Sequence, residues 1–114
     1  MNFDPEQAKQ HFELLHQDGI LMQQTVSPFA IDPLKSHICA LRDMGFSDLQ
    51  LLSFSQPHAA NGERSIIMAL KNGMFRRIRE KIIFNKPFKT EYYNFDVHKA
   101  AAALPEFIRE SNIF

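Results

Sequence analysis

Residues 31–55 constrain the fold most, because signals for a helix start, a helix end and a strand follow one another there. Asp32 is a good N-cap acceptor, and Pro33 suits the first helical position, where a missing N–H costs nothing. Gly45 suits a left-handed helix end, and the apolar run 49–54 after it is typical of a strand. The predicted order is therefore helix, sharp stop, strand. The apolar face of this helix consists of Leu34, Ile38, Leu41 and Met44.

The length of 114 residues suits one domain, 1–114, with a single core and no need of disulfides or metals. The single cysteine, Cys39, cannot form an internal disulfide. Residues 1–10 are polar and lack the apolar run of a signal peptide. No apolar stretch reaches the roughly 20 residues that cross a bilayer. A cytoplasmic protein is expected, with no contact to a membrane.

The first part of the chain repeats the order helix, glycine, strand. A helix is predicted to begin at Pro5 with Asp4 as its cap and to stop at Gly19. The first half of residues 20–31 has the composition of a strand. Pro28 cannot donate a ladder hydrogen bond, so this strand is expected at a sheet edge or to end near residue 27.

Two further strands and a third helix are predicted in the second half. Residues 65–70 lie between two Asn-Gly pairs and are apolar from the second residue on, as in a strand covered on both faces. Residues 89–95 alternate as a strand does. A capped helix is expected from Asp96, with a kink or a restart at Pro105, which removes a backbone donor.

Residues 74–84 fit two structures. As a helix, the segment has apolar residues along one side, but Arg79 interrupts them. As a strand, it places Arg77, Arg79 and Lys81 on one face. The Asn72-Gly73 pair between two apolar runs is a strong hairpin signal, so the strand is favoured.

These elements predict a single α+β domain with a mainly antiparallel sheet of about five strands and three helices packed mostly on one face. If residues 74–84 are instead a helix, the order from residue 20 becomes β-α-β-β-α-β. That alternative is a ferredoxin-like sandwich with an extra helix at each end.

The neutral net charge hides a strong segregation of charge. Residues 64–89 contain eight basic residues and one acidic residue, Glu80, for a formal charge of +7. The rest of the chain has five basic and twelve acidic residues, for a charge of −7. A binding partner meets one surface and not the sum of all charges, so this segregation bears on the choice of partner.

The basic segment and the aromatic residues after it form the candidate binding site. Guanidinium groups pair bidentately with carboxylates, which favours an acidic protein as the partner of a small inhibitor, immunity-type or adaptor protein. An alternative is RNA or DNA, with the tyrosines stacking on bases. The same charges also suit a soluble edge strand or a surface neutralised by the protein's own acidic helices. The candidate residues are Arg76, Arg77, Arg79, Lys81, Lys86, Lys89, Tyr92 and Tyr93.

Residues with catalytic potential form no recognisable motif. His11 and His16 are five residues apart, about 500° around a helix, so they cannot chelate one ion together. His11 and His37 are interpreted as hydrogen-bonded core or boundary residues, and Cys39 as a small residue on a helix flank. The sequence lacks a phosphate-binding loop, a dinucleotide fingerprint, a nucleophile elbow and a zinc-hydrolase helix. No catalytic residue, metal or cofactor is therefore predicted, and an enzyme whose groups meet only in the fold is the third hypothesis.

Overall fold

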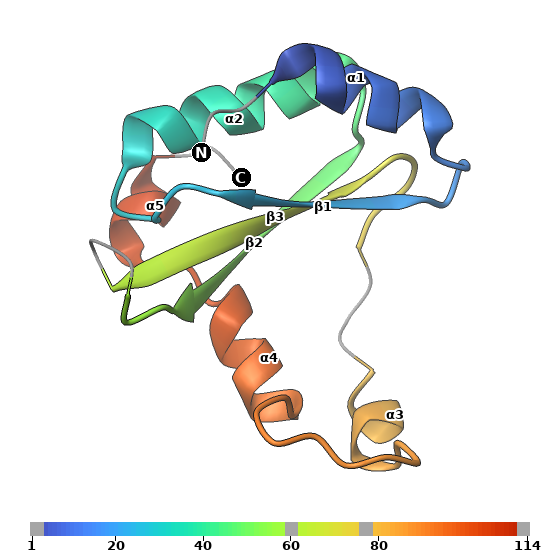
Figure 1. Cartoon of the computed structure of the whole chain (residues 1–114), viewed down its shortest axis with the longest axis vertical. Coiled ribbons are helices and arrows are strands. Elements are labelled where there is room, and N and C mark those ends of the chain that lie inside the picture. Colours follow the sequence, from blue (N-terminus) through green and yellow to red (C-terminus); the bar gives the residue numbers. More distant parts are fainter. Residues whose placement is uncertain (1–3, 59–61, 76–78, 112–114) are drawn as a thin grey trace.

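The structure is a computed structural model that describes residues 4–58, 62–75 and 79–111. These residues form three strands and five helices (Figure 1). No helix in these ranges combines the length and the apolar character needed to cross a bilayer. The elements are α1 (Pro5–Leu14), β1 (Ile20–Thr25), α2 (Ile31–Met44), β2 (Asp48–Ser55), β3 (Glu63–Leu70), α3 (Glu80–Phe84), α4 (Phe95–Ala102) and α5 (Glu106–Glu110).

The three strands form one antiparallel sheet with the order β1-β3-β2. In the central strand β3, Leu70 lies opposite Ile20 of β1 and Asp48 of β2. The predicted antiparallel sheet in an α+β fold is confirmed. The predicted strand and helix counts are wrong, because the described residues contain three strands instead of five and five helices instead of three.

The two N-terminal helices largely follow the predicted caps. Asp4 Oδ1 accepts a hydrogen bond from Glu6 N at 3.1 Å, with Pro5 as the first helical residue. Gly45 ends α2 with a φ of 112°, in the left-handed region that favours glycine. The start of α2 differs from the prediction, because the N-cap residue is Ala30 and not Asp32.

Pro33 is compatible with this earlier start of α2. The first hydrogen bond inside the helix runs from Leu34 N to Ala30 O at 3.2 Å. Pro33 precedes that donor, so its missing N–H still costs no helical bond. Asp32 stays in the first turn, where a negative charge interacts favourably with the helix dipole. Helix α1 ends at Leu14, earlier than the predicted stop at Gly19.

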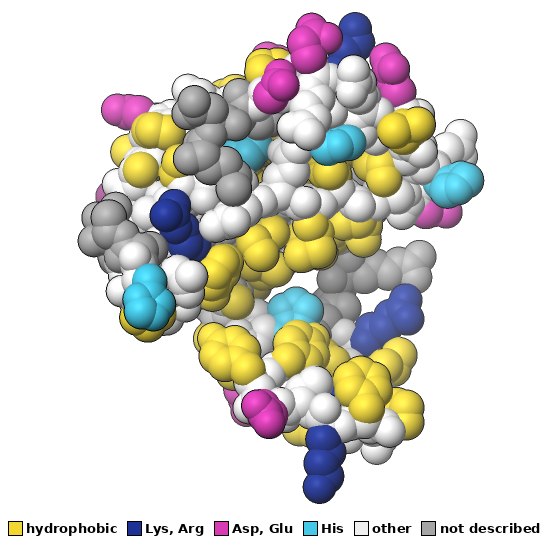
Figure 2. All heavy atoms as spheres, in the orientation of Figure 1, with side chains coloured by type: hydrophobic (Ala, Val, Ile, Leu, Met, Phe, Trp, Pro, Cys, Tyr) yellow, Lys and Arg dark blue, Asp and Glu magenta, His cyan; other side chains and the backbone are white. Residues whose placement is uncertain are grey.

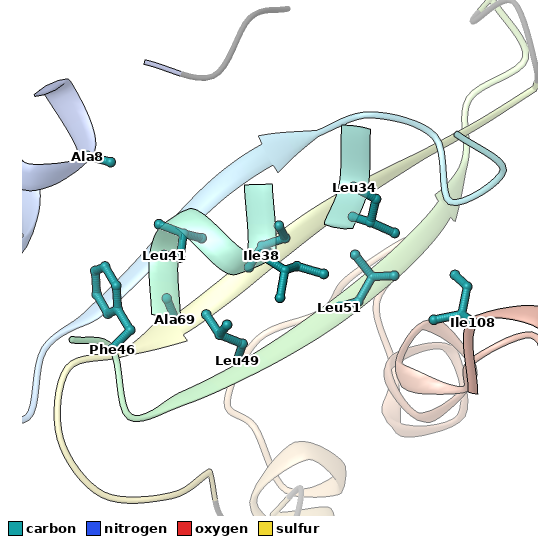
Figure 3. Packing of buried hydrophobic residues seen from close by; sticks show 10 residues of the cluster. Ala8, Leu34, Ile38, Leu41, Phe46, Leu49, Leu51, Ala69 and Ile108 are labelled. Atoms are coloured by element: carbon teal, nitrogen blue, oxygen red, sulfur yellow. The ribbon is translucent and has the colours of Figure 1, made fainter. Parts of the chain in front are cut away.

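The hydrophobic core lies between α2 and one face of the sheet (Figure 3). Burial of apolar side chains is the main favourable term in folding, so this layer accounts for most of the stability. Ile108 of α5 extends the cluster beyond the two main layers (Figure 3). The buried members are Ala8, Leu34, Ile38, Leu41, Phe46, Leu49, Leu51, Ile67, Ala69 and Ile108.

The sheet has two unlike faces. Successive side chains of a strand point to opposite faces, and the burial of β3 alternates accordingly. Helices α1 and α2 lie on one side of the sheet and α4 on the other (Figure 1). Helix α5 adds Ile108 to the core on the α2 side, so the helices do not all lie on one face. The helix-covered face carries Leu21, Gln23, Thr25, Leu49, Leu51, Ser65, Ile67 and Ala69, and the open face carries Ile20, Met22, Gln24, Gln50, Leu52, Ile66, Met68 and Leu70.

The predicted hairpin after β3 does not form. Gly73 adopts a positive φ of 87°, as a turn residue does, but the chain then leaves the sheet. Asp48 Oδ2 accepts a hydrogen bond from Phe75 N at 2.8 Å, and Ser47 Oγ donates to Gly73 O at 2.6 Å. The central strand β3 is already paired with β1 on one edge and β2 on the other, so it has no edge left for a hairpin partner. Within the described residues of the segment 74–84, the regular element is the helix α3.

The predicted strand at 89–95 is also absent, because these residues form bends and the first residue of α4. The ferredoxin-like alternative is therefore wrong as well: it needs a fourth strand that the described residues do not contain. Asn94 is the cap of α4, where its Oδ1 accepts from Val97 N at 2.8 Å, so Asp96 is not the cap. The predicted restart at Pro105 is confirmed, since α4 ends at Ala102 and α5 begins at Glu106.

Candidate functional site

A buried polar cluster joins α2 to β1. His37 of α2 is 6% exposed. Its Nδ1 lies 2.8 Å from Thr25 Oγ1, and its Nε2 lies 3.1 Å from Gln23 Oε1. The strand places Gln23 and Thr25 on the face that α2 covers, because they are two residues apart. This arrangement confirms the prediction that His37 is a hydrogen-bonded core residue.

Burial determines the protonation of His37. Desolvation lowers the pKa of His37 below its ordinary value of 6.5, so the ring is neutral at pH 7. Gln23 Oε1 can only accept, so Nε2 carries the proton and Nδ1 accepts from the Thr25 hydroxyl. Both ring nitrogens are thus occupied in a cluster that ties a helix to a strand. His11 differs: it is half-buried, and its Nδ1 has no partner among the described groups, so the hydrogen-bonded interpretation is wrong there.

The predicted basic residues are spread along α3 and the loop after it. Arg79 is the N-cap residue of α3, and Lys81 lies within that helix. Lys86 and Lys89 follow in the connection to α4. Arg76 and Arg77 lie outside the described residues. The ladder of basic side chains that a strand would give is therefore absent from the part of the segment that the structure describes.

Several of the predicted residues meet at an open cavity of about 510 Å³. Lys81, Lys86 and Tyr93 line this cavity, while Arg79, Lys89 and Tyr92 do not. The Tyr93 hydroxyl lies 2.7 Å from His98 Nδ1, which holds the tyrosine against α4. The remaining lining residues are Ile82, Ile83, Asn85, Pro87 and Phe88.

The region around this cavity is unusually apolar on its surface. Phe84, Phe88 and Tyr92 are 66%, 62% and 70% exposed. Figure 2 shows the molecule hollowed between the sheet and the segment that contains α3 and α4, with hydrophobic side chains on both sides of the hollow. Exposed apolar patches of this kind mark contact sites. None of Arg79, Lys81, Lys86 and Lys89 forms an ion pair with a described carboxylate, so the structure gives no support to neutralisation by the protein's own acids.

Other basic and reactive residues have separate roles. Lys71, part of the basic segment, donates from Nζ to Leu15 O at 2.7 Å and lies 4.7 Å from the centre of the Phe12 ring. It therefore attaches the end of α1 to the sheet.

The Cys39 side chain is exposed, as its predicted place on the helix flank implies. Among the described residues no group of three or more His, Cys, Asp and Glu residues is arranged to hold a metal ion.

The arrangement of strands and helices resembles part of the fold of two larger solved proteins. A solved spermidine synthase from Thermotoga maritima covers 96% of this chain with a TM-score of 0.81 and 23% identity, and this chain covers 39% of that protein. A spermidine synthase solved with the transition state analogue AdoDATO matches with a TM-score of 0.79 and 23% identity. This chain covers 38% of it, and 95% of this chain is matched. At this identity the likeness concerns the fold alone.

Sequence comparison gives more specific relatives, which are polyamine aminopropyltransferases. The chain is 36% identical over 96 residues to that of Halorhodospira halophila, covering 80% of this chain and 34% of the relative. It is 38% identical over 104 residues to that of Methylococcus capsulatus, covering 90% of this chain and 36% of the relative. The chain thus spans about a third of the length of these curated relatives. No protein-family model matches it.

These relatives overturn the functional prediction. The chain was expected to be a non-enzymatic inhibitor, immunity-type or adaptor protein that binds an acidic protein, with nucleic acid as the alternative partner. Its sequence relatives are enzymes named for the transfer of aminopropyl groups to polyamines. The predictions of an inhibitor or adaptor, of an acidic protein partner and of a nucleic-acid partner are therefore wrong. Charge segregation misled because a basic segment by itself does not identify the class of the binding partner.

The polar cluster around His37 was only half foreseen. The histidine was assigned to the core, but its partners Gln23 and Thr25 were not singled out. The sequence signal for these partners is the spacing of Gln23 and Thr25, two polar residues that lie two positions apart in a strand with an apolar start. Polar residues on the covered face of a strand require buried partners, and a histidine on the next helix supplies them.

Proposed function

We propose that this chain is one part of a polyamine aminopropyltransferase, an enzyme that forms a bond between an aminopropyl group and an amine nitrogen. The observation that carries the proposal is the 36% identity over 96 residues to the Halorhodospira halophila enzyme. The fold agrees with this proposal, since it resembles part of a spermidine synthase with a TM-score of 0.81.

The charges of the described residues indicate that this part does not bind the acceptor alone. A polyamine is a polycation, and carboxylates are its natural partners. Lys81 and Lys86 line the cavity next to α3 and repel such a ligand. The carboxylate of Asp48 is already occupied, because Oδ1 accepts from Leu49 N and Oδ2 from Phe75 N. No described carboxylate lines this cavity, so the acidic groups for the acceptor are expected elsewhere.

The test is product formation by the protein in its natural state. The polypeptide is purified from its own cells with any companion that it retains, and it is incubated with an isotopically labelled aminopropyl donor and a series of diamines. Mass spectrometry is expected to detect spermidine or another labelled polyamine. The 114-residue chain alone is the control, and it should form none. Absence of labelled product with every acceptor would reject the proposal.

Three further statements stand as proposals beside this one. We propose that residues 1–114 fold around one core, which the cluster between α2 and the sheet supports. A cytoplasmic location is proposed because the chain has a single cysteine, which suits a reducing compartment. Lys81, Lys86 and Tyr93 are proposed to contact a ligand or a neighbouring segment, since they share one cavity.

A further inference from the structure

The turn after β3 contains an exposed asparagine, Asn72, whose side chain makes no hydrogen bond to a described residue. The other two asparagines in the described ranges are held in place. Asn85 Nδ2 donates to Lys81 O at 2.9 Å, and Asn94 Oδ1 accepts from Val97 N at 2.8 Å. Of these three side-chain amides, that of Asn72 is therefore the one free to change its conformation.

The residue after Asn72 is the one that best permits attack on this amide. Deamidation of an asparagine begins when the backbone nitrogen of the next residue attacks the side-chain Cγ atom, and a side chain on that next residue hinders the approach. Gly73 has no Cβ, and a Cβ added there would meet no heavy atom within 4 Å. Its N–H donates to no described acceptor, so no such bond has to break first. The other two described asparagines are followed by lysine and phenylalanine.

The turn is attached to the start of β2 by two contacts that follow Asn72 in the chain. Ser47 Oγ donates to Gly73 O at 2.6 Å, and Asp48 Oδ2 accepts from Phe75 N at 2.8 Å. Before Asn72 the chain is fixed in β3, which ends two residues earlier. The contacts therefore require a set length of main chain across Asn72, and helix α3 comes after them.

We propose that Asn72 is a site of spontaneous deamidation and that the isoaspartate formed there releases the turn from β2. Gly73 N forms a bond to Asn72 Cγ, the bond from Cγ to Nδ2 breaks, and Nδ2 leaves as ammonia with the proton of the Gly73 amide. Water then opens the cyclic imide without any oxidant or reductant. Opening at the main-chain carbonyl carbon gives isoaspartate, and opening at Cγ gives aspartate. This inference is independent of the proposed function.

Isoaspartate changes the length of the main chain. The chain then runs through the former side-chain Cβ and Cγ atoms, so it gains an atom between β3 and the contacts of the turn. Gly73 O and Phe75 N are thereby displaced from Ser47 and Asp48, and hydrogen bonds weaken steeply once distance and angle depart from their optimum. Aspartate leaves the main chain unchanged and preserves both contacts. The modification thus acts on the attachment of the segment that leads to α3.

Peptide mapping by mass spectrometry tests the modification on the protein purified from its own cells and incubated at mildly alkaline pH. Conversion of the amide to an acid is expected to be severalfold faster at Asn72 than at Asn85 or Asn94. Electron-based fragmentation distinguishes isoaspartate from aspartate in the Asn72 peptide. Equal rates at the three asparagines, or a product without isoaspartate, would overturn the proposal.

Hydrogen exchange at the Phe75 amide tests the release. After incubation this amide is expected to exchange at least about tenfold faster, because it loses a hydrogen bond to a carboxylate. Deamidation that leaves the Phe75 amide as protected as before would show that the turn stays attached, which contradicts the proposal.

Two variants of Asn72 supply the matched controls. Asn72→Gln keeps an amide but has to close a larger ring, which is slower, so the Phe75 amide should stay protected during the same incubation. Equal loss of protection in this variant would assign the loss to another site, such as Asn61, which also precedes a glycine and lies outside the described residues. Asn72→Asp carries the new charge on a normal main chain and should also retain protection. Loss of protection there would reject main-chain lengthening as the cause.

Discussion

The two faces of the sheet show how differently one set of strands can be completed. The helix-covered face is closed by the chain itself, with Leu34, Ile38 and Leu41 of α2 fully buried against it. The open face has α4 against β2 but leaves Ile20 and Met22 of β1 exposed. Both faces are built from the same alternating strands, so the difference comes from what packs on them. The comparison indicates that the described residues complete the core on one face and leave part of the other face uncovered at β1.

The largest expected effect is on the free energy of unfolding, and it differs between two neighbouring residues of β2 that lie on opposite faces of the sheet. Leu51 is 1% exposed on the helix-covered face, so Leu51→Ala should lower the free energy of unfolding by about 2 to 5 kcal/mol through lost burial and a cavity. The matched control is Leu52→Ala on the open face, where the residue is half-buried and a smaller loss is expected. Urea titration measures both. Equal losses would contradict the distinction between the faces.

The second-largest expected effect is a loss of stability when the buried polar cluster of His37, Thr25 and Gln23 is disturbed. Thr25→Val removes the hydroxyl that donates to His37 Nδ1 and should cost about 1 to 3 kcal/mol, because a buried acceptor loses its partner. Gln24→Val is the control, since Gln24 is exposed on the opposite face. Thermal unfolding of the two variants compares them. A Thr25→Val protein as stable as the Gln24→Val protein would show that the cluster adds nothing to stability.

A smaller effect is expected from pH, because protonation alters one ring and leaves its two partners in place. Burial lowers the pKa of His37 in the folded chain, so the unfolded chain binds more protons below its own pKa of 6.5. The contribution of His37 to the free energy of unfolding is therefore fully present above pH 6.5. It is lost as the pH falls through the pKa of His37 in the folded chain. Denaturant titrations at several pH values measure how the free energy of unfolding changes with pH. His37→Gln should remove this part of the pH dependence, and an unchanged slope would assign it to other groups.

The smallest effect is expected on the open face. Met22→Lys places a charge on a side chain that is 55% exposed, so it should change the stability of the 114-residue chain by less than about 0.5 kcal/mol. The same charge on the helix-covered face would be buried and costly. Chemical unfolding of the chain alone tests this expectation. A large loss would mean that residues of this chain already cover Met22.

Predictions from the sequence are confirmed where the determining contacts are local. Asp4 with Pro5 and the glycine at position 45 define helix ends through hydrogen bonds and backbone angles within a few residues. The three strands between residues 20 and 70 were foreseen because alternation and apolar runs are local patterns as well. The analysis failed after Leu70, where two predicted strands are missing from the described residues.

The candidate binding residues stay a prediction, and the structure groups only some of them. Charge density singled out the segment, and Lys81, Lys86 and Tyr93 share a cavity. Their grouping depends on α3 and on the contact between Tyr93 and His98, which a strand assignment could not provide. The enzymatic relationship lies in sequence similarity spread along the chain and not in a short motif, so reading single residues did not detect it.

By itself, the sequence determined the α+β class, the start of α1 at its Asp4 cap, the end of α2 at Gly45, and an antiparallel arrangement of β1, β2 and β3, because propensities, caps and periodicity act over short distances. The tertiary structure alone decided the course of the chain after β3, where Asp48 binds Phe75 N from 27 residues away. It also decided which partners His37 has and which strand is central in the sheet. Such contacts join residues far apart in sequence, and their energies depend on geometry that local patterns do not contain.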